Sequence, residues 1–381
     1  MGGIEQNIYY FAKYSKMQHI VLTNQLHNTQ NFERIGGIEV YRVPPKVPPL
    51  KKSKKRLVSH LLKEIPREIN KIKMLKKINF DIIHLRGPYL SSDLFYGLDC
   101  VIGSSFFKKL SPWRLVNKPK IITFHALLSY TKFISPEAES SLWIYREKKS
   151  WNKFEKFLCK YSDELICVDQ YMIEPLKELS GGKEIHFIPS AVDLSIFKPM
   201  EKNETLNFLP DDVKKSLGRF NVLIIGRINE IKGVMFLNHL SKLLPKSINI
   251  IHVGEGKLPL QSSRIIKLGP LANPLLPYLI NHSDIVFHPA ITEGIGRTAL
   301  ETLACGKPII MLGKHMNRFP LINGKNGFIV DDPKSAAEII LELYNSQNFY
   351  KQIAINAILT SKDFDVRELA GKVDKIYKTV A

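Results

Sequence analysis

The feature that most constrains the fold is the regular alternation of short apolar segments with amphipathic helical segments along the whole chain. Runs of about five residues rich in Ile, Val and Phe are separated by stretches whose apolar residues recur every three or four positions. This alternation is typical of parallel α/β sheets. The expected strands are His19–Thr23, Asp81–Leu85, Lys120–Phe124, Glu164–Val168, Asn221–Ile225, Asn249–Val253, Arg264–Leu268, Asp284–His288, Pro308–Leu312 and Phe328–Val330.

The length of the chain, 381 residues, predicts two domains, because it is long for one hydrophobic core. The stretch Ser190–Pro210 is rich in Pro, Asn and charged residues, so we expect the hinge there. We expect two doubly wound, Rossmann-like domains facing a cleft, with ligands at the carboxyl ends of the strands. The expected domains are 1–190 and 191–362, followed by a terminal helix in 363–381. The expected helices of the second half are Gly233–Leu244, Arg297–Ala304, Lys334–Asn345 and Val366–Thr379.

Membrane-spanning, secreted and zinc-binding classes are disfavoured by the sequence. No run approaches the roughly 20 apolar residues that cross a bilayer, and Met1–Tyr14 lacks the pattern of a signal peptide. The four cysteines, Cys100, Cys159, Cys167 and Cys305, are scattered without metal-ligand spacing, which predicts free thiols. We expect a cytoplasmic protein.

A first candidate for an anion site follows the strand Asn221–Ile225, where Gly226-Arg227 and Lys232-Gly233 lead into a helix. Gly226 permits a tight turn with close backbone approach. Arg227 and Lys232 fall where a phosphate would meet the free N–H groups at a helix start. Taken alone, two basic residues after a strand are more often solvated surface.

A stronger signal is a Gly-rich loop with two carboxylates eight positions apart, Glu293 and Glu301. Gly294 and Gly296 allow the loop backbone to approach a ligand, and the helix start supplies donors for an anion. A carboxylate one turn inside the helix is well placed to accept hydrogen bonds from ribose hydroxyls. Two unrelated glutamates would be the simpler explanation for this pair alone, but the basic loop upstream favours a nucleotide site.

These residues resemble the E-x7-E motif of glycosyltransferase family four, a group of retaining enzymes with the GT-B fold. The resemblance covers nearly the whole chain in family order. It includes the interdomain stretch from Ile188 to Pro199, where Ser190-Ala191 replaces the family's Asn-Gly. Further matching segments are Gly226-Arg227…Lys232-Gly233, His252–Gly256, Leu268-Gly269, Asn326–Phe328 and a terminal helix that in the family returns to the N-terminal domain.

The resemblance implies a role for each matching residue. Arg227 and Lys232 would bind the donor's diphosphate, Glu301 the ribose, and Glu293 the sugar hydroxyls. Backbone contacts around the donor would come from the neighbouring loop and strand ends. The residues implied in substrate binding are Gly3, Gly226, Gly254, Leu268, Gly294, Ile295, Gly296, Arg297, Thr298 and Glu301, and those implied in catalysis are His125, Arg227, Lys232 and Glu293.

The implied chemistry is transfer of a hexose from a nucleotide diphosphate sugar to a glycan or polyprenyl-linked acceptor. The departing diphosphate gains negative charge, which a fixed Arg, a fixed Lys and a helix N-terminus stabilise. The donor loop contains no D-x-D-like cluster, so we expect no metal and no other cofactor. Same-face attack and a covalent intermediate on Glu293 both remain open.

Three features of the first half and the donor loop bear on this resemblance. His125 follows a predicted strand and matches a family histidine that contacts the donor sugar, although a lone His at a strand end is more often structural. Gly2-Gly3-Ile4-Glu5 resembles the family's first loop, but the family's preceding central strand is missing, which suggests a mis-assigned start or a truncation. Arg297 stands where the family usually has an apolar residue, which suggests added charge beside the phosphate or recognition of an anionic acceptor.

The net charge of +19 requires an explanation. Residues 1–190 carry a surplus of 13 positive charges and residues 191–381 a surplus of 6. The stretch 50–78 combines many lysines with apolar residues at helical spacing, interrupted by Pro66. It fits either a helix pair with a solvated lysine face or a surface that contacts an anionic membrane at the inner face of the cell. No RNA-binding signature accompanies the charge, so nucleic acid is disfavoured.

Three functions remain open. The first is a glycosyltransferase that acts on a lipid-linked or membrane-presented acceptor. The second is a soluble GT-B enzyme such as a disaccharide synthase, or an epimerase, against which the E-x7-E motif weighs. The third is a non-catalytic nucleotide-sugar-binding protein, which the retained Arg227, Lys232, Glu293 and Glu301 disfavour.

Overall fold

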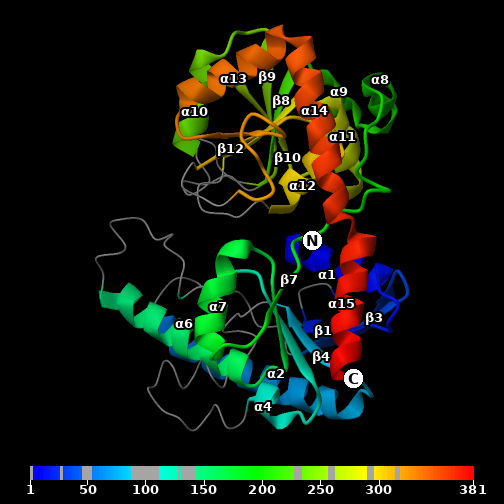
Figure 1. Ribbon diagram of the computed structural model, residues 1–381, viewed down its shortest axis with the longest axis vertical. Helices are drawn as coiled ribbons and strands as arrows, with labels where there is room; N and C mark the ends of the chain where they lie inside the picture. Colours follow the sequence, from blue (N-terminus) through cyan, green and yellow to red (C-terminus); the bar gives the residue numbers. More distant parts are fainter. Residues whose placement is uncertain are drawn as a thin grey trace. The chain divides into compact units, whose positions relative to one another are not determined.

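The computed structural model describes the chain in ten stretches (Figure 1). They are residues 3–25, 29–44, 54–86, 111–127, 129, 142–226, 234–255, 262–289, 296–313 and 318–381; within them the side chains of 3–4, 54–65, 112–113, 142–150 and 234 are not described. The chain forms two compact units. Unit 1 comprises Met1–Pro189 and Leu369–Ala381, and unit 2 comprises Ser190–Glu368.

Unit 1 contains two sheets among its described residues. The first has the order β1-β3-β2, with β3 parallel to β1 and antiparallel to β2. The second has the order β4-β5-β6-β7 and is parallel throughout. The strands are β1 (Ile20–Asn24), β2 (Phe32–Ile35), β3 (Ile38–Val43), β4 (Ile83–Arg86), β5 (Lys120–Phe124), β6 (Glu164–Cys167) and β7 (Ile185–Phe187).

A break separates these two sheets at the place where the family's first strand was expected to be missing. In a doubly wound sheet of the order 3-2-1-4-5, the first strand lies between its second and fourth strands. Here β1 and β4 occupy those flanking positions. Among the described residues β1 pairs only with β3 and β4 only with β5, so one edge of each strand has no partner strand. The first described element is helix α1 (Gly3–Tyr14).

Unit 1 also contains further helices, and the last of them, α15 (Val366–Val380), begins in unit 2 and lies mostly in unit 1. The others are α2 (Lys54–Lys77), α4 (Pro112–Leu115), α6 (Leu142–Lys160), the 3-10 turn Gln170–Met172 and α7 (Ile173–Ser180). The core lies between β5, β6, α6 and α7, where side chains such as Ile122, Phe154 and Leu165 are fully buried.

Helix α2 corrects one expectation, because it runs without interruption through Pro66. The expected helix pair is therefore wrong. Arg67 and Glu68 are buried, and Glu68 accepts a hydrogen bond from Lys71 at 2.5 Å. Arg67 is thus no part of a solvated basic face.

Helix α15 packs on unit 1 through polar contacts. Asp374 accepts hydrogen bonds from the Ser15 hydroxyl and from the Lys16 backbone N–H, the latter at 2.8 Å. The Tyr377 hydroxyl lies 2.7 Å from Nδ1 of His84 on β4. These contacts connect the last helix to residues more than 290 positions earlier.

The described residues of unit 2 form one parallel sheet of six strands in the order β10-β9-β8-β11-β12-β13. The strands are β8 (Phe220–Ile225), β9 (Ile248–Val253), β10 (Ile265–Gly269), β11 (Ile285–His288), β12 (Ile309–Leu312) and β13 (Phe328–Val330). The four residues of β11 are buried, as a central strand with helices on both faces requires.

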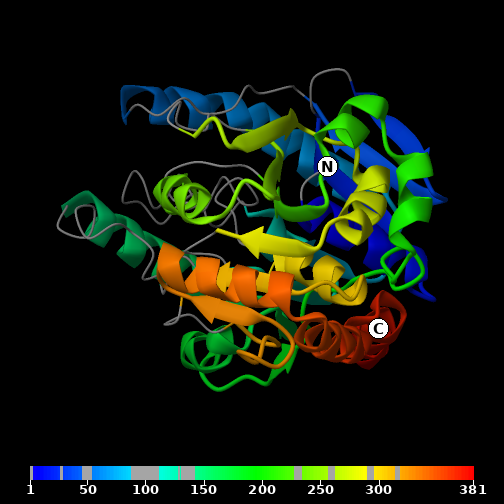
Figure 2. The same cartoon turned by 90° about the horizontal axis from the view of Figure 1, so that it is seen from above.

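Helices cover both faces of this sheet (Figure 2). One apolar cluster includes α10 and α13, the other includes α11 and α12, and α14 contributes to both. The elements are α8 (Lys202–Thr205), α9 (Asp211–Ser216), α10 (Val234–Leu243), α11 (Leu276–His282), α12 (Gly296–Ala304), α13 (Pro333–Asn345) and α14 (Gln347–Ser361), with 3-10 turns at Leu206–Phe208, Asn273–Leu275 and Lys362–Phe364.

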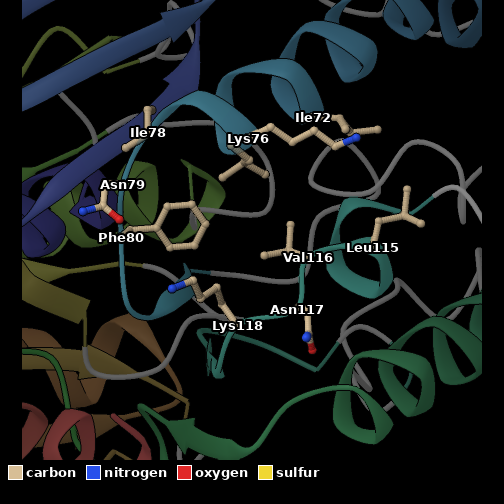
Figure 3. Close-up of a pocket in the computed structure, with 10 residues that line it drawn as sticks. Ile72, Lys76, Ile78, Asn79, Phe80, Leu115, Val116, Asn117 and Lys118 are labelled. Carbon is tan, nitrogen blue, oxygen red and sulfur yellow. The ribbon is translucent and has the colours of Figure 1, made fainter.

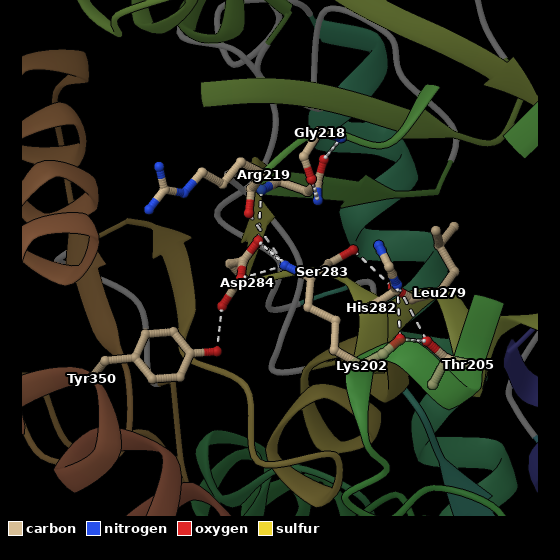
Figure 4. A network of polar contacts seen from close by, with 10 residues as sticks. Lys202, Thr205, Gly218, Arg219, Leu279, His282, Ser283, Asp284 and Tyr350 are labelled. Carbon is tan, nitrogen blue, oxygen red and sulfur yellow. Dashed lines mark hydrogen bonds and ion pairs between the residues drawn. The ribbon is translucent and has the colours of Figure 1, made fainter. Parts of the chain in front are cut away.

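The stretch expected to be the hinge is held firmly to unit 2. Val192 donates to Phe364 at 2.9 Å and accepts from Val366 at 3.0 Å. Lys202 contacts both carboxylate oxygens of Asp284, at 2.8 and 2.9 Å, and Tyr350 donates to the Asp284 carbonyl at 2.8 Å (Figure 4). This network fixes the start of unit 2 at the amino end of β11.

Candidate functional site

Glycines end three neighbouring strands of unit 2 at the carboxyl edge of its sheet. The N–H of Gly226 donates to Val253 at 2.9 Å, and the N–H of Gly254 donates to Gly269 at 2.9 Å. A Cβ on Gly254 would lie 2.2 Å from the carbonyl oxygen of Gly226, and its φ of +141° also favours glycine. The edge formed by β8, β9 and β10 is therefore bare backbone, as close approach of a ligand requires, and Leu268 precedes the last of these glycines.

His252 holds one of these turns in place. Its Nε2 donates to the carbonyl oxygen of Gly226 at 2.8 Å, across from β9 to the end of β8. Burial lowers the pKa of His252, the bond to Gly226 opposes that shift, and Lys267 adds to it. A neutral ring with a fixed N–H therefore shapes the start of the predicted phosphate loop.

Helix α12 begins next along the sheet, after β11, which pairs with β8. It starts at Gly296, whose φ is +59°. From Ala299 to Ala304 the helix is buried, and Glu301 is only 4% exposed. Thr298 contributes its carbonyl to a 2.7 Å bond from the Thr302 hydroxyl.

A buried ion pair joins the two charged residues of this helix. Nη2 of Arg297 donates to Oε1 of Glu301 at 2.5 Å, and the side chains are 9% and 6% exposed. Burial raises the pKa of Glu301, and the Arg297 guanidinium acts in the opposite direction. The carboxylate predicted to bind a ribose thus has a cationic partner within its own helix.

In unit 1, His125 immediately follows β5. Burial, and then repulsion by Arg86, lowers the pKa of His125 to about 3. Its Nε2 is buried and has no hydrogen-bond partner among the residues that the structure describes. His125 is therefore a neutral ring with an unused nitrogen at the carboxyl end of a central strand.

The structure adds two residues beside His125 that the sequence reasoning missed, His84 and Arg86. His84 lies 2.7 Å from both the Thr123 hydroxyl and the Tyr377 hydroxyl. Arg86 stacks over the Phe11 ring at 4.9 Å. The alternation of polar and apolar residues in the strand before Gly87 could have pointed to His84 and Arg86. Their partner Tyr377 in α15 lies too far along the chain for a local sequence pattern to identify it.

The other predicted site residues divide into two groups. Gly3 begins α1, and Gly226, Gly254, Leu268, Gly296, Arg297, Thr298 and Glu301 occupy the carboxyl edge of the unit 2 sheet or the helix that follows it. Arg227, Lys232, Glu293, Gly294 and Ile295 lie outside the described residues.

A groove of about 350 Å³ lies at the opposite, amino edge of the β4-β5 sheet in unit 1 (Figure 3). Ile72 and Lys76 of α2 line one side, and Leu115 and Lys118 line the other. Leu115 is 50% exposed. The groove combines apolar side chains with lysines, and it contains none of the predicted donor residues.

The described residues show neither a metal-ligand cluster nor a membrane-spanning helix. Among them, no three His, Cys, Asp or Glu side chains cluster as metal ligands would. In that same part of the chain no helix is long and apolar enough to cross a membrane.

Comparison with known families matches both units. "Glycosyltransferase Family 4" matches residues 1–196, and "Glycosyl transferases group 1" matches residues 219–346. An uncharacterized glycosyltransferase of Methanocaldococcus jannaschii is 25% identical over 318 residues, which cover 80% of this chain and 79% of that protein.

Two further relatives carry informative names. The UDP-Gal:alpha-D-GlcNAc-diphosphoundecaprenol alpha-1,3-galactosyltransferase of Escherichia coli is 23% identical and covers 71% of this chain and 67% of its own. The structure of Anabaena HepE in complex with UDP-glucose matches with a TM-score of 0.67 at 18% identity, covering 100% of this chain and 96% of that one.

Proposed function

The chain belongs to glycosyltransferase family 4 and has the GT-B fold, and from this premise we propose that it transfers a hexose from a nucleotide diphosphate sugar to a lipid-linked or glycan acceptor with retention of configuration. The observation that carries the donor assignment is the glycine edge of unit 2, with the buried carboxylate of Glu301 on the adjoining helix.

The donor would bind along this edge. Bare backbone at Gly226 and Gly254 admits the diphosphate closely, and Glu301 accepts hydrogen bonds from the ribose. Arg227 and Lys232 then stabilise the charge that develops on the leaving diphosphate. The Anabaena relative was solved with UDP-glucose, which supports a sugar nucleotide as the donor.

His125 suits a contact with the transferred sugar. Because its pKa is lowered to about 3, it stays neutral and can donate one N–H to a sugar hydroxyl without adding charge. Retention would follow either from same-face attack, in which the departing phosphate oxygen takes the acceptor's proton, or from a covalent intermediate on Glu293.

We also propose that the acceptor is presented at an anionic membrane surface. The Escherichia coli relative acts on a diphosphoundecaprenol-linked sugar. On α2 the side chains of Lys73, Lys76 and Lys77 are exposed and Ile69 is 42% exposed, next to the groove of Figure 3. Each basic residue near an anionic leaflet contributes about 1 kcal/mol of attraction, which salt screens.

The test is a thermal-shift screen of UDP, GDP, ADP, CDP and dTDP, followed by transfer assays with the matching sugar nucleotides. A nucleotide at about 100 times its Kd stabilises the folded protein by about 2.7 kcal/mol. We expect Lys232→Ala and Arg227→Ala each to lower kcat about a hundredfold, about 3 kcal/mol of barrier.

Lys351→Ala, at an exposed position of α14, is the matched control and should keep wild-type turnover. If no nucleotide stabilises the protein, or if both variants turn over normally, the donor assignment is wrong. Binding of a nucleotide without any transfer would instead indicate a binding protein.

A further inference from the structure

The ion pair between Arg297 and Glu301 is not explained by the stability of α12. The two residues are four positions apart, so they share one face of the helix. The pair has the less favourable order, with the cation nearer the helix N-terminus, where the helix dipole opposes positive charge. Burial at 9% and 6% exposure adds a desolvation cost for both charges.

The contact does, however, fix the geometry of the carboxylate. Oε1 of Glu301 is held by the guanidinium at 2.5 Å, and the side chain is buried against α12's neighbours. Among the described residues, no other side chain donates a hydrogen bond to the Glu301 carboxylate. Oε1 of the carboxylate therefore accepts a hydrogen bond from the protein, and the remaining lone pairs of the carboxylate can accept hydrogen bonds from a ligand.

We propose that Arg297 is a positioning residue for nucleotide recognition, which acts through Glu301 by holding this carboxylate as a preset acceptor for the ribose hydroxyls. The inference rests on the proposed function and names a determinant of donor binding within it. It also assigns Arg297 a different task from contact with a phosphate or an anionic acceptor.

The charge of Arg297 has a second consequence. Burial raises the pKa of Glu301, and Arg297 opposes that rise. A protonated carboxyl uses one oxygen as a donor and accepts fewer hydroxyl hydrogen bonds. Removal of Arg297 therefore lets the Glu301 carboxyl become protonated at a higher pH than in the wild-type protein, so that nucleotide affinity relative to wild type falls as the pH is lowered.

The experiment is isothermal titration of the nucleoside diphosphate that binds best among UDP, GDP, ADP, CDP and dTDP, at several pH values. The variants are Arg297→Met, Arg297→Lys, Glu301→Gln and the double variant R297M/E301Q. We expect Arg297→Met to bind about tenfold more weakly than wild type near pH 6 and to recover towards wild type near pH 8.5. Arg297→Lys, which keeps the charge, should stay within about threefold of wild type.

Arg297→Met alone leaves a buried carboxylate without its partner and can destabilise the fold. The comparison of R297M/E301Q with Glu301→Gln avoids this problem, because neither variant contains that buried carboxylate. If Arg297 acts through Glu301, R297M/E301Q and Glu301→Gln have the same Kd. A further loss in the double variant, or an equal loss at every pH in Arg297→Met, shows direct contact with the nucleotide and overturns the proposal. Wild-type affinity in Arg297→Met at low pH overturns it as well. If none of the five nucleotides binds the wild-type protein, it is the proposed function that fails, and this inference falls with it.

Discussion

At the residue scale, His125 shows how burial sets chemistry. Its pKa is lowered to about 3, so between about pH 3 and pH 6.5 the unfolded chain binds a proton there that the folded protein does not. The stability that this site contributes is present above pH 6.5 and is lost as the pH falls. Between pH 7.5 and pH 5, wild type should lose about 1 to 2 kcal/mol of unfolding free energy that His125→Gln retains.

Urea unfolding at the two pH values measures this difference. His239→Gln, at an exposed position of α10, is the control and should follow wild type. A difference between wild type and His125→Gln that does not change with pH would contradict the neutral buried ring.

The glycines at the strand ends of unit 2 were easier to predict from the sequence than the side-chain contacts around them. Gly226, Gly254 and Gly296 follow strands or open a helix, and strand ends are legible from local pattern. The pairing of Arg297 with Glu301 is also local, four positions along one helix, yet the apolar setting that makes it unusual depends on tertiary packing. The contact of His84 with Tyr377 spans 293 positions and lies beyond any local pattern.

At the scale of elements, all ten predicted strands are present, each within two residues of its predicted ends. The sequence missed the hairpin of β2 and β3, whose strands are partly exposed and turn through Gly36 and Gly37, and it missed the three-residue β7. Short or half-exposed strands give little apolar signal. Pro66 was expected to interrupt a helix, but packing of α2 on unit 1 outweighs the lost hydrogen bond.

The proposed membrane contact of the stretch 50–78, which includes α2, has a direct test. Wild-type protein should sediment with vesicles that contain anionic lipid and should be released by salt. Replacing Lys51, Lys52, Lys54, Lys55 and Arg56 by Gln should abolish most of this binding. The control replaces five exposed lysines of unit 2 by Gln and removes the same charge: Lys246, Lys325, Lys334, Lys351 and Lys362.

Equal binding to neutral vesicles, or an equal loss in both variants, would show that the stretch is only a solvated face. Transfer to soluble acceptors is compatible with that result.

The attachment of α15 should be measurable in stability. Tyr377→Phe removes the hydroxyl that lies 2.7 Å from His84 and also bonds Arg86. Leaving buried polar partners unsatisfied costs about 1 to 3 kcal/mol. Chemical denaturation of Tyr377→Phe should show this loss, whereas Lys375→Ala, at an exposed position of the same helix, should not. Equal stability of the two variants would mean that the hydroxyl contributes nothing.

At the scale of the whole molecule, the two-unit α/β architecture follows from length and alternation, and the GT-B fold is confirmed. The arrangement of unit 1 in two sheets is harder to predict from the sequence, because it depends on which strand edges pair with one another.

We propose that the enzyme requires no metal ion for transfer. Turnover should persist after EDTA treatment and dialysis, because Arg227 and Lys232 supply the positive charge. Activity that returns only on addition of magnesium or manganese would contradict this.

Helix α15 also bears on the order in which the molecule is made. Unit 2 is one contiguous segment, whereas unit 1 needs Leu369–Ala381 in addition to its first 189 residues. At about 5 to 20 residues per second, a ribosome takes about 10 to 40 s to synthesise the chain that separates these two parts of unit 1. During that interval the contacts of Asp374 and Tyr377 do not exist, so Lys16 and His84 in the nascent unit 1 lack these partners. The half of the protein that is translated first is therefore the half that is completed last.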